Sequence, residues 1–75
     1  GVIADKDGFI VTAGGSAGYN PRIADIIVDK VDEKRALEIV DNIFNYYIEN
    51  AEMGEKLGFF IDRIGIEEFK KSVLK

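Results

Sequence analysis

The sequence contains no cysteine and no histidine. Without cysteine, the chain has no disulfide, no thiolate nucleophile and no thiolate ligand for zinc or an iron–sulfur cluster. Without histidine, it lacks the commonest metal ligand and the usual proton acceptor at neutral pH. The chain by itself therefore lacks most of the side chains on which metal binding and catalysis depend.

Long apolar runs and excess positive charge are also absent. No apolar run approaches about 18 residues, the length of a membrane span, and no basic and apolar leader precedes Val2. Ten basic and fourteen acidic residues give a net charge of −4, which argues against nucleic acid or an anionic membrane as a partner. We therefore expect a cytoplasmic protein that binds neither nucleic acid nor a membrane.

The chain is short, with 75 residues of which 47% are apolar and 32% are charged. This composition is typical of a globular protein, but a chain of this length buries only about 60% of the surface that its unfolded form exposes. It begins with Gly1 rather than Met, as a processed product or an excised piece of a longer protein does. We expect one small domain over residues 1–75, cut from a larger protein and stabilised by partner surface.

Glycine is concentrated at the start, because residues 1–22 hold five of the eight glycines. Two β-prone runs, at residues 2–4 and 9–13, are separated by Asp-Lys-Asp-Gly, and Asp-Gly between β runs is typical of a hairpin turn. Residues 14–22 contain three glycines and the only proline, which predicts a loop. The β-branched residues that follow favour a strand over 24–30, although a four-residue spacing there also suits a helix.

The middle of the chain has helical periodicity. After Asp32, a good N-cap, apolar residues recur at three- and four-residue intervals. The apolar stripe comprises Ala36, Leu37, Val40, Ile43, Phe44, Tyr47, Ile48 and Ala51. We predict an amphipathic helix from Asp32 to about Met53, stopped by Gly54. Tyr46 falls outside the stripe, where it could lean on a partner surface.

Two short helices are predicted at the C-terminus. The first covers residues 57–64, is weakened by Gly58 and ends at Gly65, and the second covers residues 66–74. Helices this short are unstable in isolation and must pack on something. The predicted fold class is α+β: an N-terminal β-hairpin plus a third short strand, packed against one long amphipathic helix and two short C-terminal helices.

One segment has the character of a binding site: residues 14–22, with the sequence GGSAGYNPR. Successive backbone N–H groups in a glycine-rich turn can point into one concavity and hold an anion. Arg22 could add a bidentate contact to a carboxylate or phosphate. The segment lacks the G-x-G-x-x-G order of dinucleotide-binding loops and the Gly-Lys-Ser/Thr ending of a P-loop. An anion-contacting loop and a simple tight turn both explain these glycines.

The other charged clusters fit a solvated surface better than a chemical site. Four aspartates in the β region lack the alternating spacing of a calcium loop. Glu67 and Glu68 are adjacent on a helix and do not converge on one substrate. We predict no metal ligand and no catalytic residue within the chain.

The order of the elements carries a resemblance to a known family. The β run at residues 9–13, the glycine loop, the long helix and the ending at residues 61–69 follow one another over nearly the whole chain. In this order they resemble the C-terminal part of the nitrite and sulfite reductase domain that carries siroheme and a 4Fe-4S cluster. The resemblance implies an oxidoreductase that transfers several electrons to a small oxyanion, nitrite or sulfite.

Four residues match the family's glycine loop: Gly14, Gly15, Gly18 and Arg22. The resemblance implies that they are cofactor-binding residues, and a glycine-rich turn with an arginine suits siroheme, which is rich in carboxylates. In the family, four cysteines that hold the cluster lie upstream of this loop, and none is present here. The resemblance therefore implies that the remainder of the parent reductase holds the cluster and that this chain is inactive alone.

The leading hypothesis is thus a segment of a siroheme-dependent nitrite or sulfite reductase. The alternative is a stand-alone α+β module that binds a protein through the glycine loop and Tyr46. A small anion-binding domain is a third interpretation.

Overall fold

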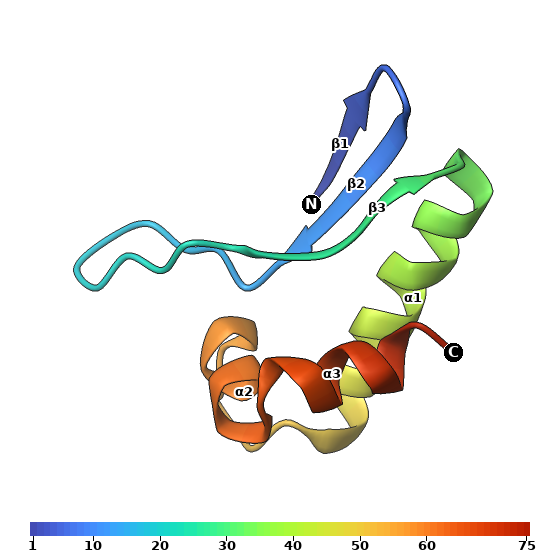
Figure 1. The fold of residues 1–75 in the computed structure, drawn as a ribbon. Helices are drawn as coiled ribbons and strands as arrows, with labels where there is room; N and C mark the ends of the chain where they lie inside the picture. Colours follow the sequence, from blue (N-terminus) through green and yellow to red (C-terminus); the bar gives the residue numbers. More distant parts are fainter.

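The computed structural model describes all residues 1–75 and has an α+β fold (Figure 1). Its elements are β1 (Val2–Asp5), β2 (Gly8–Ala13), β3 (Asp25–Val31), α1 (Glu33–Asn50), α2 (Leu57–Ile64) and α3 (Ile66–Val73). The strands form one antiparallel sheet in the order β1-β2-β3. α1 packs on β2 and α3, and α2 packs on α3. The predicted fold class is confirmed.

The β1–β2 hairpin turns between Asp5 and Gly8, which pair with each other, as the Asp-Gly signal predicts. The Asp5 carboxylate accepts a hydrogen bond of 2.7 Å from the Lys6 N–H. Gly8 has a φ of +136°, and a Cβ there would lie 2.9 Å from the Val31 carbonyl oxygen. Glycine is therefore required both for the turn and for the close approach of β3.

β3 pairs with β2 out of regular register. Val28 lies opposite Val11 and Ile26 opposite Thr12, so Ile27 is an extra residue on β3. Such a bulge redirects the side chain of the inserted residue. Ile27 is accordingly buried in the core with 4% exposure. The predicted strand is confirmed, shifted by one residue, and the helical alternative for this segment is wrong.

α1 begins as predicted and ends earlier than predicted. The Asp32 carboxylate caps the helix by accepting a hydrogen bond of 2.8 Å from the Arg35 N–H. The helix stops at Asn50, not near Met53, because the next segment folds back on it. The Tyr47 hydroxyl donates to the Glu55 carbonyl oxygen, which holds this segment against the helix.

The face that α1 buries differs from the predicted one. Its buried residues are Ala36, Ile39 and Ile43, and Ile39 was not part of the predicted stripe. Four members of that stripe are exposed: Leu37 by 55%, Val40 by 36%, Phe44 by 61% and Ile48 by 64%. The apolar arc of α1 is wider than the surface that α2, α3 and the sheet cover. Part of it therefore stays in solvent.

Tyr46 is half-buried and packs on the aromatic residues of α2 and α3, so its position has an explanation within the chain, and its contact with a partner stays a prediction. Its ring centroid lies 5.6 Å from that of Phe60 and 6.0 Å from that of Phe69. Phe60 and Phe69 are fully buried and meet edge to face at 6.1 Å. This aromatic cluster fixes α2 and α3 on the side of α1 that carries Ile39 and Tyr46.

α2 and α3 meet at Gly65, which has a φ of +92° and ends α2 as predicted. The core that the helices and sheet enclose consists of ten buried apolar residues, and no polar side chain is buried. None of the three helices is both long enough and apolar enough to cross a membrane.

Candidate functional site

The glycine loop, residues 14–22, extends from the end of β2 beyond the rest of the sheet (Figure 1). Its two arms are joined by a bridge in which Ser16 and Arg22 exchange backbone hydrogen bonds of 2.9 and 3.0 Å. Gly18 lies at the tip, where its added Cβ would meet no atom within 4 Å. Tyr19 beside it is fully exposed. The tip is therefore set apart from the base of the loop.

Arg22 ties the base of the loop to the helices. Its Nε and Nη2 donate to the two carboxylate oxygens of Asp62 on α2, at 3.1 and 2.8 Å. Nη2 also donates to Asp25 at 2.8 Å, and Nη1 donates to the carbonyl oxygens of Gly14 and Ile23 at 3.1 and 3.3 Å. These five bonds match the five N–H donors of a guanidinium group. An anion that binds Arg22 directly would have to displace one of these acceptors.

This pairing perturbs both charged partners. The hydrogen bonds from Arg22 lower the pKa of Asp62 below its ordinary value. Hydrogen bonds to Asp62 and Asp25 in turn raise the pKa of Arg22. The Asp62 side chain is 61% exposed, so solvent screens the attraction and its main effect is geometric.

Two glycines allow the loop and α2 to touch. Gly14 has a φ of +86°, and its added Cβ would lie 2.5 Å from Nη1 of Arg22 and 3.0 Å from Cδ1 of Ile61. A Cβ on Gly58 would lie 2.5 Å from Cδ of Arg22 and 2.7 Å from the Gly14 carbonyl oxygen. The sequence suggested Gly58 only as a weak point in a helix. A glycine inside a helical pattern was the one available signal of this close approach.

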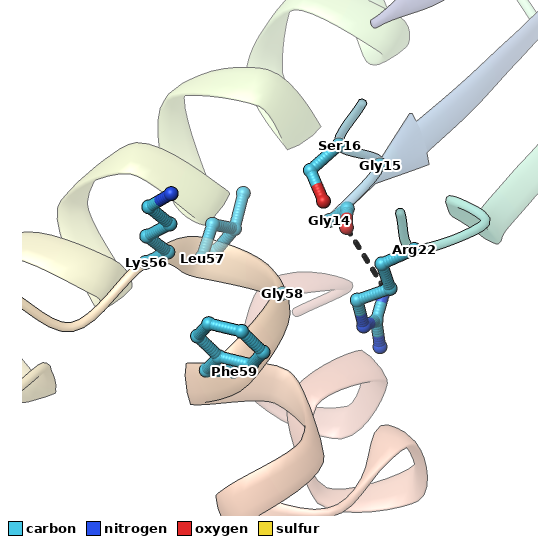
Figure 2. A pocket seen from close by; sticks show the side chains of 8 residues that line it. All are labelled: Gly14, Gly15, Ser16, Arg22, Lys56, Leu57, Gly58 and Phe59. Atoms are coloured by element: carbon cyan, nitrogen blue, oxygen red, sulfur yellow. Dashed lines mark hydrogen bonds between the residues drawn. The ribbon is translucent and has the colours of Figure 1, made fainter. Parts of the chain in front are cut away.

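A pocket of about 160 Å³ lies where the loop meets α2 (Figure 2). It is lined by Gly14, Gly15, Ser16, Arg22, Lys56, Leu57, Gly58 and Phe59, and we call it the loop–helix pocket. The structure thus brings together three of the four predicted site residues, Gly14, Gly15 and Arg22. It does not bring Gly18 to them. The sequence analysis did not predict three other parts of this pocket: Ser16, Lys56 and the start of α2.

The loop–helix pocket is suited to an anion. Residues 57–59 form the first turn of α2, whose N–H groups have no acceptor within the helix, and the preceding Lys56 side chain provides no cap. The N-terminal end of the helix dipole favours negative charge. Lys56 forms no ion pair within the chain and is exposed beside these amides. Lys56 and residues 57–59, which carry this ammonium group and these free amides, line the pocket, and such groups suit a carboxylate or phosphate.

A second ion pair fixes the segment that carries Lys56. Arg63 donates to both carboxylate oxygens of Glu55, at 2.7 and 2.8 Å, and its guanidinium carbon lies 5.5 Å from the ring centroid of Phe60. The hydrogen bonds from Arg63 lower the pKa of Glu55 to about 2. This pair holds the α1–α2 connection against the end of α2.

Comparisons with known proteins give one family. The chain matches the nitrite and sulphite reductase 4Fe-4S domain over residues 1–75. It is 26% identical over 74 residues to an assimilatory-type sulfite reductase of Nitratidesulfovibrio vulgaris, covering 99% of this chain and 34% of that protein. No solved structure matches the chain.

Two nitrite reductases are also similar. The nitrite reductase (NAD(P)H) large subunit of Klebsiella oxytoca is 26% identical over 77 residues, which is 100% of this chain and 8% of that subunit. The nitrite reductase (NAD(P)H) of Emericella nidulans is 29% identical over 76 residues, which is 99% of this chain and 7% of that protein. The chain thus spans about a third or less of the length of these relatives.

Replacing Gly58 tests the contact between the loop and α2. Alanine inside a helix ordinarily stabilises by roughly 0.5–1 kcal/mol relative to glycine. Here we expect Gly58→Ala to destabilise the chain, because the new methyl group meets Arg22 and Gly14, and overpacking of this kind costs about 1–3 kcal/mol. Urea denaturation followed by circular dichroism measures the change. A variant more stable than the parent chain would show that the contact is absent.

The Glu55–Arg63 pair predicts a specific dependence on pH. Because the folded-state pKa of Glu55 is about 2, against an ordinary value of 4.5, the pair stabilises the fold fully above pH 4.5. Between these values the unfolded chain binds a proton that the folded chain does not, so stability is lost as the pH falls towards 2. We expect the stability difference between the chain and Glu55→Gln to shrink over this range, as measured by urea midpoints. A difference that is constant from pH 5 to 2 would contradict the assignment.

Proposed function

The chain belongs to the nitrite and sulphite reductase 4Fe-4S domain family, and on this premise we propose that it is part of a siroheme-dependent nitrite or sulfite reductase. In this proposal, the loop–helix pocket contacts a carboxylate group of siroheme. The parent enzyme reduces a small oxyanion, and siroheme, when bound, supplies the metal centre for that reduction. The residues of this chain serve to bind and orient the cofactor.

The observation that carries the proposal is the donor set of the loop–helix pocket. Gly14 and Gly15 line the pocket from the loop, and Lys56 with residues 57–59, whose amides have no acceptor within the helix, line it from the start of α2. Carboxylates are the acceptors that such a set prefers. Siroheme is rich in carboxylates, so the residues present fit an edge of this cofactor.

In the proposal, Arg22 does not bind siroheme directly. Its five donors are engaged within the chain, so it acts as a positioning residue that fixes the loop on α2. Lysine, with a single point charge, cannot reproduce a fork that joins Asp62, Asp25 and two carbonyl groups. A cofactor contact by Gly18 stays a prediction, and it would have to occur at the exposed tip of the loop.

The residues of this chain do not fit a 4Fe-4S cluster. Such a cluster is held by thiolates, and the chain has no cysteine and no convergent group of acidic side chains. In the proposal, the rest of the parent enzyme supplies these ligands. The chain alone is then inactive because it holds neither the cluster nor a complete siroheme site.

The proposal is tested by siroheme retention in the full-length reductase that contains this segment. Lys56→Gln removes one charged donor from the pocket, and we expect siroheme to bind roughly tenfold more weakly, for a loss of about 1.4 kcal/mol. Lys34→Gln, an exposed lysine on α1 outside the pocket, is the matched control. Siroheme absorbance per protein, measured across a dilution series, reports the binding.

A second variant tests whether Arg22 acts through the geometry of its hydrogen bonds or through its charge alone. Arg22→Lys keeps the positive charge and loses the fork, so we expect siroheme retention to fall as it does for Arg22→Ala. If Lys56→Gln and both Arg22 variants retain siroheme like the control, the pocket does not hold the cofactor. If Arg22→Lys retains siroheme and Arg22→Ala does not, Arg22 acts through its charge, and the positioning role is wrong.

A further inference from the structure

α1 presents a second apolar stripe that nothing in the chain covers. Leu37, Val40, Phe44 and Ile48 are spaced by three and four residues and are between 36% and 64% exposed. At this spacing they share one side of the helix. They adjoin the buried face formed by Ala36, Ile39 and Ile43, so the apolar surface continues from the core into solvent.

Two residues of this stripe, Val40 and Phe44, line an open groove of about 590 Å³, which we call the apolar groove. The helix wall is formed by Val40, Ile43, Phe44 and Tyr47, and Leu57 closes one end. The opposite wall is formed by residues 1–2 of the β1 strand region and residues 12–15 at the end of β2. The groove shares Gly14, Gly15 and Leu57 with the loop–helix pocket, so the two sites adjoin each other.

The register of β1 on β2 shows what can enter this groove. Val2 pairs with Val11 and Ile3 with Ile10, so the next pair towards the N-terminus is Gly1 with Thr12. Gly1 and Thr12 do exchange hydrogen bonds: the Gly1 nitrogen donates to the Thr12 carbonyl oxygen at 2.7 Å and the Thr12 N–H donates to the Gly1 carbonyl oxygen at 2.8 Å. The ladder is therefore intact up to the nitrogen of Gly1.

One further residue on this strand would lie opposite Ala13. Side chains alternate between the two faces of a strand, so that residue would share the face of Val2 and of its buried partner Val11. Val2 and Ala13 line the groove, and Phe44 and Val40 stand across from them. A side chain attached directly before Gly1 would thus enter the apolar groove, whereas the side chain one position earlier would face away from it.

We propose that the apolar groove is occupied by the polypeptide that continues β1 beyond Gly1 in the parent reductase, with an apolar side chain directly before Gly1. The inference rests on the proposed function, in which this chain is a segment of a longer enzyme. The chain spans between 7% and 34% of the length of these relatives, so their polypeptides extend well beyond the matched region. Gly14 and Gly15 line both the apolar groove and the loop–helix pocket, so filling the groove also supports the loop–helix pocket.

Because side chains alternate between the two faces of a strand, moving one added isoleucine by a single position tests the proposal directly. Two chains of identical composition are compared, one with Ser-Ile and one with Ile-Ser added before Gly1. The register puts the isoleucine of the Ser-Ile extension in the groove and that of the Ile-Ser extension in solvent. We expect the Ser-Ile chain to melt roughly 5 °C higher, since a small change in stability shifts the Tm of a chain this short by several degrees. Equal melting temperatures, or a higher value for Ile-Ser, would overturn the proposal.

If these short chains show no cooperative melting, two variants of the full-length reductase test whether the groove is occupied. Phe44 lines the groove and Ile48 does not, although their exposures in this structure are nearly equal, 61% and 64%. In the full-length reductase, we expect Phe44→Ser to lower the Tm by several degrees more than Ile48→Ser does. Equal effects would mean that the groove stays empty in the enzyme.

Two further readouts separate the remaining outcomes. Siroheme content, measured on the same reductase samples, reports the loop–helix pocket, so the proposed function and the groove assignment can fail independently. Sedimentation of the 75-residue chain reports self-association. A dimer that is lost on Phe44→Ser and persists with the Ser-Ile extension would show that a second copy occupies the groove, which contradicts the proposal.

Discussion

The Arg22 guanidinium is the interaction on which the candidate site depends. It joins β3 through Asp25, the start of the loop through the Gly14 carbonyl and, 40 residues further along the chain, α2 through Asp62. A planar group with five fixed donors can do this, and each donor here has an acceptor. The glycines at positions 14 and 58 are consequences of the same contact, because any side chain there would push the loop and α2 apart.

The rest of the fold supplies a small core and a surplus of apolar surface. Eleven of the 75 residues are buried, while large apolar side chains are exposed on α1, on the sheet and on the loop. The aromatic cluster around Phe60 uses one side of α1, and the other side faces the apolar groove. A chain with this distribution is well suited to packing inside a larger enzyme, in agreement with the length of its relatives.

The sequence predicted those features that local patterns determine. The β-prone runs, the helical periodicity, the Asp-Gly turn, the Asp32 cap and Gly65 were enough to place the strands and helices within a few residues. The prediction of the buried face of α1 was wrong because its apolar residues cover a wide arc of the helix. Their spacing does not show which half of that arc meets the core. Packing of Phe60 and Phe69, residues distant in sequence, makes that choice and also brings Tyr46 against their rings. The partners of Arg22 could not be foreseen either, since Asp62 follows it by 40 positions and only the tertiary fold brings them together.

We propose above all that the glycine loop, held on α2 by Arg22, forms a pocket for a carboxylate of siroheme. The most direct measurement is the distance from the siroheme carboxylate oxygens to the backbone nitrogens of Gly15, Leu57 and Gly58 in a crystal structure of the full-length, siroheme-loaded reductase. We expect at least one such distance of about 3 Å, the length of an N–H to oxygen hydrogen bond. A cofactor whose carboxylates all lie on other parts of the enzyme, with this pocket facing solvent or protein, would contradict this proposal.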